Sequence, residues 1–166
     1  SAIQVVPNVA GEVADLKVFQ RTPSWVMPKY NRTFTDKDHR AWAKHPWKQK
    51  AHRLGLYWTM ESALPAILWY PKLLKVGELM HKRALNKHIK DPALRRKLTP
   101  DYKVGCKRTL VSDDWFPAFA RPNVHLITDG IREITETGVR TSDGVEHPLD
   151  VIIYCTGYEI GAPAFP

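Results

Sequence analysis

The stretch LKVFQRT, residues 16–22, carries the strongest fold signal in this sequence. Apolar side chains flank Lys17 in its first part, as in a half-buried strand, and Pro23 closes the stretch directly afterwards. The preceding segment SAIQVVPNV, residues 1–9, predicts a short helix whose length is limited by Pro7. A helix that leads through a turn into a strand is a repeating step of α/β proteins, so the sequence predicts an α/β fold.

The end of this predicted strand holds a candidate binding residue. In a dinucleotide-binding unit, the residue that ends the second strand decides the cofactor, because an acid there binds the ribose of NAD and an arginine accommodates the 2′-phosphate of NADP. If Ser1 opens the helix after the first strand of such a unit, Arg21 stands at that position and Thr22 adds a hydroxyl. Position alone is weak evidence, since most arginines after strands are ordinary surface residues.

The middle of the chain predicts helices. Thr35 and Asp38 have the spacing of a capping box for a helix over residues 36–50, with a kink or break at Pro46. A further helix over residues 72–90 ends before Asp91-Pro92, which opens a short helix that reaches residue 98. The longer helix is expected to pack in the core or against another domain through one apolar face, which consists of Leu73, Val76, Met80 and Ala84.

The last third of the chain predicts short strands. Gly-containing turns such as Ser142-Asp143-Gly144 separate runs of β-branched and apolar residues. The predicted strands cover residues 107–111, 124–127, 131–135, 138–141 and 151–155.

The composition is that of a globular protein. The 166 residues are 43% hydrophobic and 25% charged, which excludes collagen-like and disordered chains. No apolar run is long enough to span a bilayer, and no signal peptide opens the chain. Cys106 and Cys155 have neither disulfide-framework nor zinc spacing, so we expect free thiols and a cytoplasmic location.

Positive charge gathers in the middle of the chain. Residues 37–108 hold 18 basic and 5 acidic side chains, and this excess suits nucleic acid, an anionic surface or a phosphorylated cofactor. Tryptophans among the lysines keep a nucleic-acid-binding module open as an alternative, although they also suit a core or a substrate channel. The scattered histidines predict no metal site. Asp113 and Asp114 predict a helix N-cap rather than a catalytic pair.

Three separated motifs resemble one known family. They are SAIQVVPNVA with LKVFQRTPSWVMPK, then GCKRTLVSDDWFPAFARPNVHLIT, and finally HPLDVIIYCTGYE. In this order they resemble the reduced-nicotinamide-binding region of class B flavin-dependent monooxygenases, the superfamily of Baeyer-Villiger and flavin-containing monooxygenases, and are closest to the Baeyer-Villiger branch. The likeness runs from Ser1 to Glu159 and is loose only in the basic helical middle. Cys155 replaces the usual alanine of the last motif.

The resemblance implies roles for particular residues. Arg21 and Thr22 would hold the NADPH 2′-phosphate, and Lys107 would be its second contact. Arg108 would be the catalytic residue beside the flavin, where a guanidinium that stays protonated stabilises negative charge better than lysine does. The family pattern also places Ser1, Thr156 and Gly157 among the cofactor-binding residues, and it implies no metal.

The resemblance also implies a fold and an activity. The fold is a partial Rossmann-like NADPH-binding domain with a helical insertion, and the cofactors are FAD and NADPH. The parent enzyme would insert one oxygen atom from O2 into a ketone through a flavin peroxide. Oxygenation of nitrogen or sulfur is the sister alternative, and a flavin-dependent reductase is a third. The expected partners are a small-molecule substrate and an FAD domain of the same chain, without specific nucleic acid or a membrane span.

The resemblance further predicts how the chain is organised. Residues 1–35 would begin the NADP-binding unit, 36–100 form the basic helical insertion, 101–150 complete the unit, and 151–166 return as a strand toward the FAD domain. The glycine loops of the family precede Ser1 in the pattern, and the chain does not begin with Met. We therefore expect a fragment that is inactive when isolated.

Overall fold

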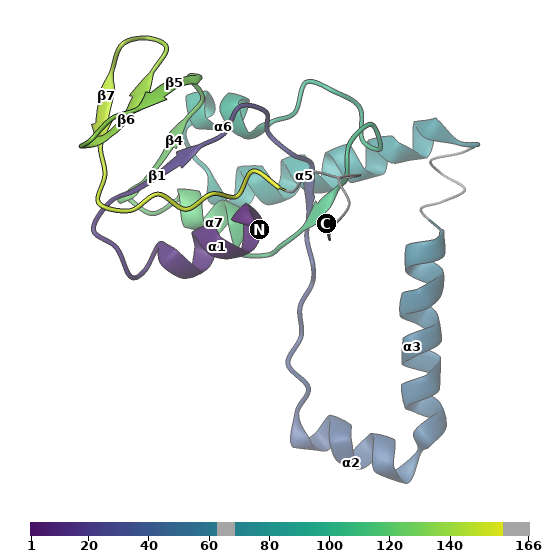
Figure 1. Ribbon diagram of the computed structural model, residues 1–166. Helices are drawn as coiled ribbons and strands as arrows, with labels where there is room; N and C mark the ends of the chain where they lie inside the picture. Colours follow the sequence, from purple (N-terminus) through teal and green to yellow (C-terminus); the bar gives the residue numbers. More distant parts are fainter. Residues whose placement is uncertain (63–68, 158–166) are drawn as a thin grey trace, which may run out of the picture. The chain divides into compact units, whose positions relative to one another are not determined.

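The structure is a computed structural model that describes residues 1–62 and 69–157. The chain divides into two compact units, each made of segments that are distant in the sequence. Unit 1 contains residues 1–23, 88–97 and 114–166, and unit 2 contains residues 24–87 and 98–113. Figure 1 labels the helices and strands of both.

Unit 1 is built on a pair of parallel strands. The strands β1 (Leu16–Phe19) and β4 (Val124–Ile127) pair in parallel, and the helices α1 (Ala2–Val9) and α7 (Trp115–Phe119) contact each other. The side-chain amide of Asn123 donates to the backbone carbonyls of Ala10 (3.0 Å) and Val13 (2.9 Å). These two bonds tie the α1–β1 connection to the start of β4. Parallel pairing joined by a long crossover is the hallmark of α/β architecture, so the predicted fold class is confirmed.

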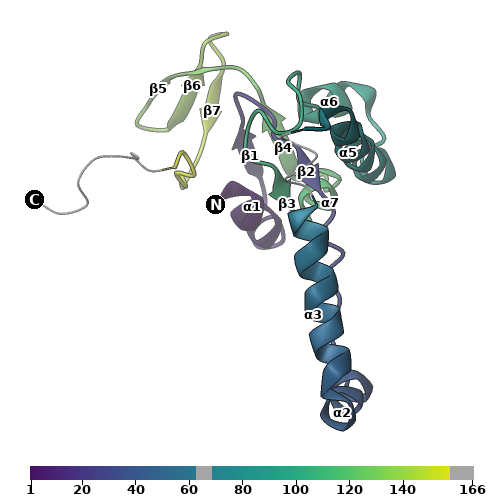
Figure 2. The same cartoon turned by 90° about the vertical axis from the view of Figure 1, so that its right-hand side faces the viewer.

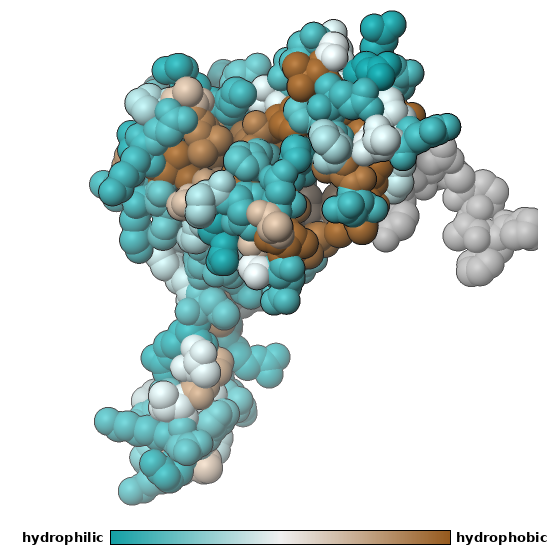
Figure 3. Space-filling view, turned by 90° about the vertical axis from the view of Figure 1, so that its left-hand side faces the viewer, coloured by the Kyte–Doolittle hydropathy of each residue, from teal (hydrophilic) through white to brown (hydrophobic). Residues whose placement is uncertain are grey.

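The second sheet of unit 1 is an antiparallel meander. It consists of β5 (Ile131–Ile134), β6 (Gly138–Thr141) and β7 (Glu146–Pro148), which lie side by side in Figures 1 and 2. Val139 and Thr141 on the central strand are buried, whereas Ile131 and Ile134 on its neighbour are exposed. Figure 3, seen from the side of this sheet, shows apolar patches among hydrophilic residues.

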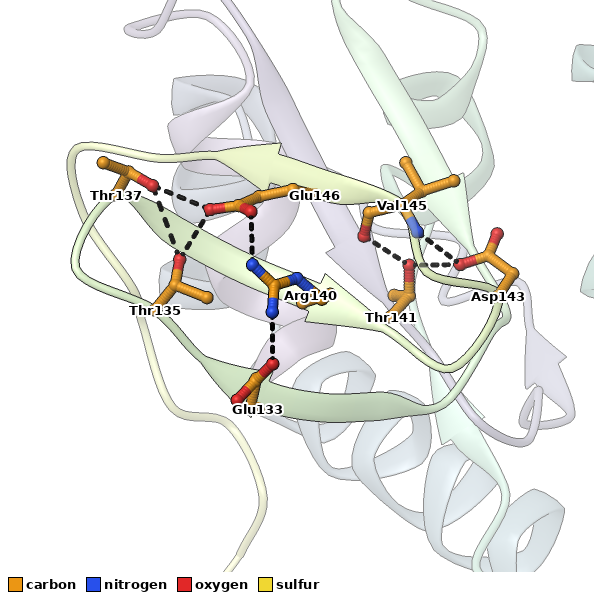
Figure 4. Close-up of polar contacts among 8 residues, drawn as sticks. All are labelled: Glu133, Thr135, Thr137, Arg140, Thr141, Asp143, Val145 and Glu146. Atoms are coloured by element: carbon orange, nitrogen blue, oxygen red, sulfur yellow. Dashed lines mark hydrogen bonds and ion pairs between the residues drawn. The ribbon is translucent and has the colours of Figure 1, made fainter.

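An arginine between two glutamates joins the three strands of the meander, as Figure 4 shows. The Arg140 guanidinium donates to Glu133 (2.6 Å) and to Glu146 (2.8 Å). The hydroxyls of Thr135 and Thr137 donate to the other oxygen of Glu146 at 2.9 and 2.8 Å. The bond from Arg140 and then those from the threonines lower the pKa of Glu146 to about 2.

The meander is therefore expected to weaken in acid. Glu146 has a lower pKa in the folded chain than its ordinary 4.5, so its stabilising contribution is present above pH 4.5 and is lost as the pH falls toward 2. Glu146→Gln should increase amide exchange on β6 at pH 7, and the difference from the unmodified chain should vanish near pH 2. Glu136→Gln, at an exposed acid of the neighbouring turn, serves as the control and should change nothing. An equal effect of both variants would contradict the prediction.

Unit 2 contains two helices without buried side chains. They are α2 (Asp36–Lys44) and α3 (Pro46–Glu61), which contact each other and have only His45 between them in the sequence. Figures 1 and 2 show α2 at the end of α3. The capping box is confirmed, because Thr35 accepts from the Asp38 amide (3.4 Å) and the Asp38 carboxylate accepts from the Thr35 amide (2.9 Å). The predicted break at Pro46 is also confirmed, since α3 begins there.

The buried part of unit 2 surrounds a short parallel pair of strands. The strand β2 (Val26–Met27) pairs with β3 (Leu110–Val111), and the helix α5 (Leu74–His88) follows the short turn η1 (Pro71–Leu73). A Cβ on Gly77 would lie 2.9 Å from the Met27 side chain, so α5 approaches β2 closely there. The buried residues of α5 are His81 and Leu85.

A buried histidine forms the centre of this packing. His81 is 0% exposed, and its Nδ1 accepts from the Val26 amide at 3.1 Å. The ring of Trp25 packs edge-on against His81 with 4.8 Å between centroids. Burial first of all holds the pKa of His81 below its usual 6.5 and so favours the neutral ring. Nδ1 carries no proton because it accepts the hydrogen bond from the Val26 amide.

Unit 2 is expected to lose stability in mild acid. Because the folded-state pKa of His81 lies below 6.5, the unfolded chain takes up a proton first as the pH falls through 6.5, and this favours unfolding. The melting temperature should therefore fall between pH 7.5 and pH 5. His81→Gln should flatten this dependence, whereas His39→Gln, at an exposed position, should preserve it. A flat profile in the unmodified chain would refute the prediction.

Most predicted elements are confirmed, with differences at particular residues. The predicted helix over 1–9 is α1, which continues past Pro7 to Val9. Asp91 caps α6 (Pro92–Leu98) by accepting from the amides of Ala93 and Leu94. Two strand predictions are wrong: residues 151–155 form no strand, and of the predicted strand over residues 107–111 only Leu110–Val111 is a strand. A strand needs a partner, and among the described residues the segment 151–155 pairs with none. Leu73 and Val76 of the predicted packing face are exposed, so these two do not belong to the core, and packing against another domain stays a prediction.

Candidate functional site

The predicted phosphate-binding pair follows strand β1. The parallel ladder continues to Gln20, whose amide donates to the Ile127 carbonyl (2.9 Å), and Arg21 and Thr22 come directly after it. Arg21 is exposed and Thr22 is partly exposed. The carboxyl end of a parallel strand is where open α/β sheets place their ligands, so both side chains stand at the expected edge.

Ser1 lies at the start of helix α1. Its carbonyl accepts from the amides of Gln4 (2.8 Å) and Val5 (3.0 Å), while its side chain makes no capping hydrogen bond. Helix α1 and strand β1 run in opposite directions in Figure 1, so this end of α1 and the carboxyl end of β1 face the same way. Amide groups at a helix N-terminus favour anions, which suits a site for a dinucleotide.

Thr156 and Gly157 end the described part of the chain. Gly157 has a positive φ of +96°, which an L side chain rarely adopts, and a Cβ there would meet nothing within 4 Å. The glycine is therefore required by the backbone conformation rather than by close packing. Both residues belong to unit 1, as do Ser1, Arg21 and Thr22.

Lys107 and Arg108 lie in unit 2, on a loop before strand β3. The loop contains a turn in which the Cys106 amide donates to the Lys103 carbonyl (3.2 Å), and Gly105 has a φ of +94°. The Lys107 ammonium lies 4.7 Å from the ring centre of Tyr102, on the other side of this turn. Lys107 and Arg108 are both exposed.

These cations suit an anionic ligand. Within residues 1–62 and 69–157, no carboxylate forms an ion pair with Arg21, Lys107 or Arg108, whereas Arg140 is held by two glutamates. A guanidinium with an adjacent hydroxyl can make paired, charge-assisted bonds to a phosphate. The donors at the end of β1 therefore fit the extra phosphate of NADP.

The part of the chain that the structure describes also bears on sites of other kinds. It contains no cluster of three His, Cys, Asp or Glu side chains that could hold a metal ion, and no helix suited to crossing a bilayer. Both cysteines are free. A hollow between α1 and α7 contains none of the predicted site residues and is lined by Pro7, Asn8, Asp114, Pro117, Ala118 and Arg121.

The structure also reveals residues that sequence reasoning missed. Asp114 stands at the predicted N-cap position of α7, although its side chain makes no capping hydrogen bond. The Asp113 carboxylate accepts from the backbone amides of Lys29 (2.8 Å), Tyr30 (3.2 Å) and Asn31 (2.9 Å). These bonds, led by the one from Asn31, lower the pKa of Asp113. Sequence reasoning also missed His81, because its partners Trp25 and Val26 lie far away in the sequence. It missed Tyr102 because the contact with Lys107 depends on the geometry of the turn between them.

Known proteins resemble the chain over nearly its whole length. It is 41% identical over 163 residues to a Baeyer-Villiger monooxygenase of Pseudomonas aeruginosa, and 40% identical over 161 residues to one of Streptomyces coelicolor. These alignments cover 98% and 96% of the chain and 31% of each relative. The chain is homologous to part of the Baeyer-Villiger monooxygenases. No family model matches it.

Solved structures agree with this homology to Baeyer-Villiger monooxygenases. A cyclohexanone monooxygenase mutant from Rhodococcus sp. Phi1 bound to NADP+ has a TM-score of 0.75 and 25% identity over 96% of the chain. The complex of OTEMO with FAD and NADP has a TM-score of 0.70, also at 25% identity, over 95% of the chain. The chain spans 37% and 36% of these two proteins, so it is about a third as long as the monooxygenases that it matches.

Proposed function

We propose that this chain is the NADPH-binding part of an FAD-dependent Baeyer-Villiger monooxygenase. The whole enzyme would use NADPH and O2 to insert one oxygen atom into a small-molecule ketone. The observation that carries the proposal is the 41% identity to a Baeyer-Villiger monooxygenase along 98% of the chain. Nucleic-acid binding has no comparable support, since the basic segment belongs to the same alignment.

The NADPH 2′-phosphate is assigned to the end of strand β1. Arg21 would bind it through paired hydrogen bonds and Thr22 through its hydroxyl, with Lys107 as a second cationic contact. Ser1, Thr156 and Gly157 would lie along the rest of the cofactor. Support comes from the position of Arg21 after a parallel strand and from the absence of a competing carboxylate within the described residues.

Arg108 is assigned to the reaction itself. FAD, when bound by the whole enzyme, supplies the reaction with reduced nicotinamide and oxygen. The guanidinium of Arg108 would be held beside the reacting atoms, where it would stabilise negative charge and could not lose its proton to a dry site. Its exposure on a loop with no ion pair among the described residues leaves its charge available for that task.

The proposed organisation follows the same assignment. Residues 1–35 and 101–150 would form the NADP-binding unit, residues 36–100 a basic helical insertion, and residues 151–166 the return toward an FAD domain. That domain would be the main protein partner. Two free thiols suit a reducing compartment, and we place the enzyme in the cytoplasm.

The proposal is tested on the complete enzyme that carries this chain. Incubation with NADPH, labelled O2 and a mixture of a cyclic ketone, a tertiary amine and a thioether should give a lactone that contains one labelled oxygen atom. Products labelled only on nitrogen or sulfur would favour the sister branch and refute ketone insertion. NADPH oxidation that never labels a product would indicate a reductase and refute the oxygenase assignment altogether.

A further inference from the structure

The loop that carries Lys107 is closed at both ends by one buried residue of unit 2. Trp25 is 3% exposed, and its indole N–H donates to the Tyr102 carbonyl at 2.8 Å. Its own carbonyl accepts from the Leu110 amide, also at 2.8 Å. The backbone on either side of residues 103–109 is therefore fixed to one residue, Trp25, through its indole at one end and its carbonyl at the other.

A turn then brings two side chains of this loop together. The chain reverses between Lys103 and Cys106, and the positive φ of Gly105 is what this reversal requires. Val104, inside the turn, is buried and holds it against the unit. Tyr102 and Lys107 flank the turn, and the ammonium of Lys107 is 4.7 Å from the centre of the tyrosine ring.

We infer that Tyr102 is a positioning residue for Lys107 and so contributes to the preference for NADPH over NADH. A free lysine side chain loses much rotational freedom when it binds a ligand. A ring beneath the ammonium already restricts that freedom, and its attraction is weak enough for a doubly charged phosphate to share the cation. The inference rests on the proposed phosphate contact of Lys107.

The ring contact predicts an effect that depends on the phosphate. An exposed cation–π contact changes affinity by about two- to fivefold. Tyr102→Leu should therefore raise the dissociation constant for NADP+ by that factor and leave the constant for NAD+ unchanged. Tyr102→Phe keeps the ring and should bind both cofactors as the unmodified enzyme does. Calorimetry on the complete enzyme and its two variants, with NADP+ and NAD+ as probes, measures all six dissociation constants.

Two lysine variants separate the parts of the argument. Lys107→Met should weaken NADP+ binding, and Tyr102→Leu should then have no further effect in that background. Lys103→Met, in the same turn, is the matched control and should leave the NADP+ to NAD+ ratio unchanged. If Lys107→Met does not alter the ratio, the phosphate contact is wrong. If Lys107→Met alters the ratio of NADP+ to NAD+ binding and Tyr102→Leu does not, the positioning role of Tyr102 is wrong.

A second measurement needs no cofactor. Reductive methylation with 13C keeps the lysine charge, and methyl groups above an aromatic ring resonate upfield. The Lys107 signal, assigned by its loss in Lys107→Met, should be shifted upfield in this chain and in Tyr102→Phe, and unshifted in Tyr102→Leu. An unshifted Lys107 signal in the unmodified chain would show that the ammonium does not lie over the Tyr102 ring, and this would overturn the inference. Equal loss of NADP+ and NAD+ binding in Tyr102→Leu would show a merely structural role and also overturn the inference.

Discussion

Replacement of Arg108 by alanine in the complete enzyme is expected to lower the rate of ketone oxygenation by about 10²- to 10³-fold. Removing a fixed cation from a site where negative charge develops has effects of this size, because no solvent dipole is already oriented to replace it. Binding of NADP+ should change far less, since the phosphate is assigned to Arg21, Thr22 and Lys107. Labelled product per NADPH consumed is the measurement.

A lysine at the same position separates charge from geometry. Arg108→Lys keeps a cation but not the planar fork or the permanent protonation, so it should restore only part of the oxygenation and lose activity toward alkaline pH. Arg96→Ala, at an exposed arginine of α6, is the control and should oxygenate normally. A normal product yield from Arg108→Ala would remove Arg108 from the catalytic assignment.

Replacement of Arg21 by alanine is expected to change the cofactor preference. The Michaelis constant for NADPH should rise by about 10- to 100-fold, since a hydrogen bond to a charged group contributes roughly 1.5–3 kcal/mol. The constant for NADH should stay nearly unchanged, because that cofactor has no 2′-phosphate to lose. Steady-state kinetics with both cofactors give the ratio directly.

The matched control for this prediction lies in the same unit. Arg132 on β5 is an exposed arginine, so Arg132→Ala removes the same charge from the surface of unit 1. It should leave the NADPH to NADH ratio unaltered. Similar losses for both cofactors in Arg21→Ala would mean that Arg21 supports the fold rather than the phosphate, and would contradict its assignment.

Local patterns account for the elements that were predicted well. The capping box at Thr35 and the break at Pro46 depend on neighbouring backbone groups, which the sequence displays directly. Strands β1 and β4 were recognisable because each is a short apolar run bounded by turn residues. The positions of Arg21 and Thr22 follow from the end of β1 and were predictable for the same reason.

Packing between distant segments accounts for the errors. The predicted apolar face of the long helix omitted His81, since a histidine counts as polar until a distant backbone amide and an indole ring surround it. The segment at 151–155 has the composition of a strand, but pairing depends on a partner that composition does not supply. The Asp113 carboxylate accepts hydrogen bonds from backbone amides that lie 82–84 positions earlier in the chain, which no local pattern indicates.

The sequence by itself determined the α/β class, the homology and the places of Arg21, Thr22, Lys107 and Arg108 along the chain. These depend on periodicity, turn chemistry and motif order, which are local properties. Only the tertiary structure decided that Trp25 fixes both ends of the Lys107 loop and that Tyr102 lies beneath the ammonium. The reason is that a hydrogen bond between residues 25 and 102 depends on how the chain closes in space, whereas a linear pattern specifies only neighbours.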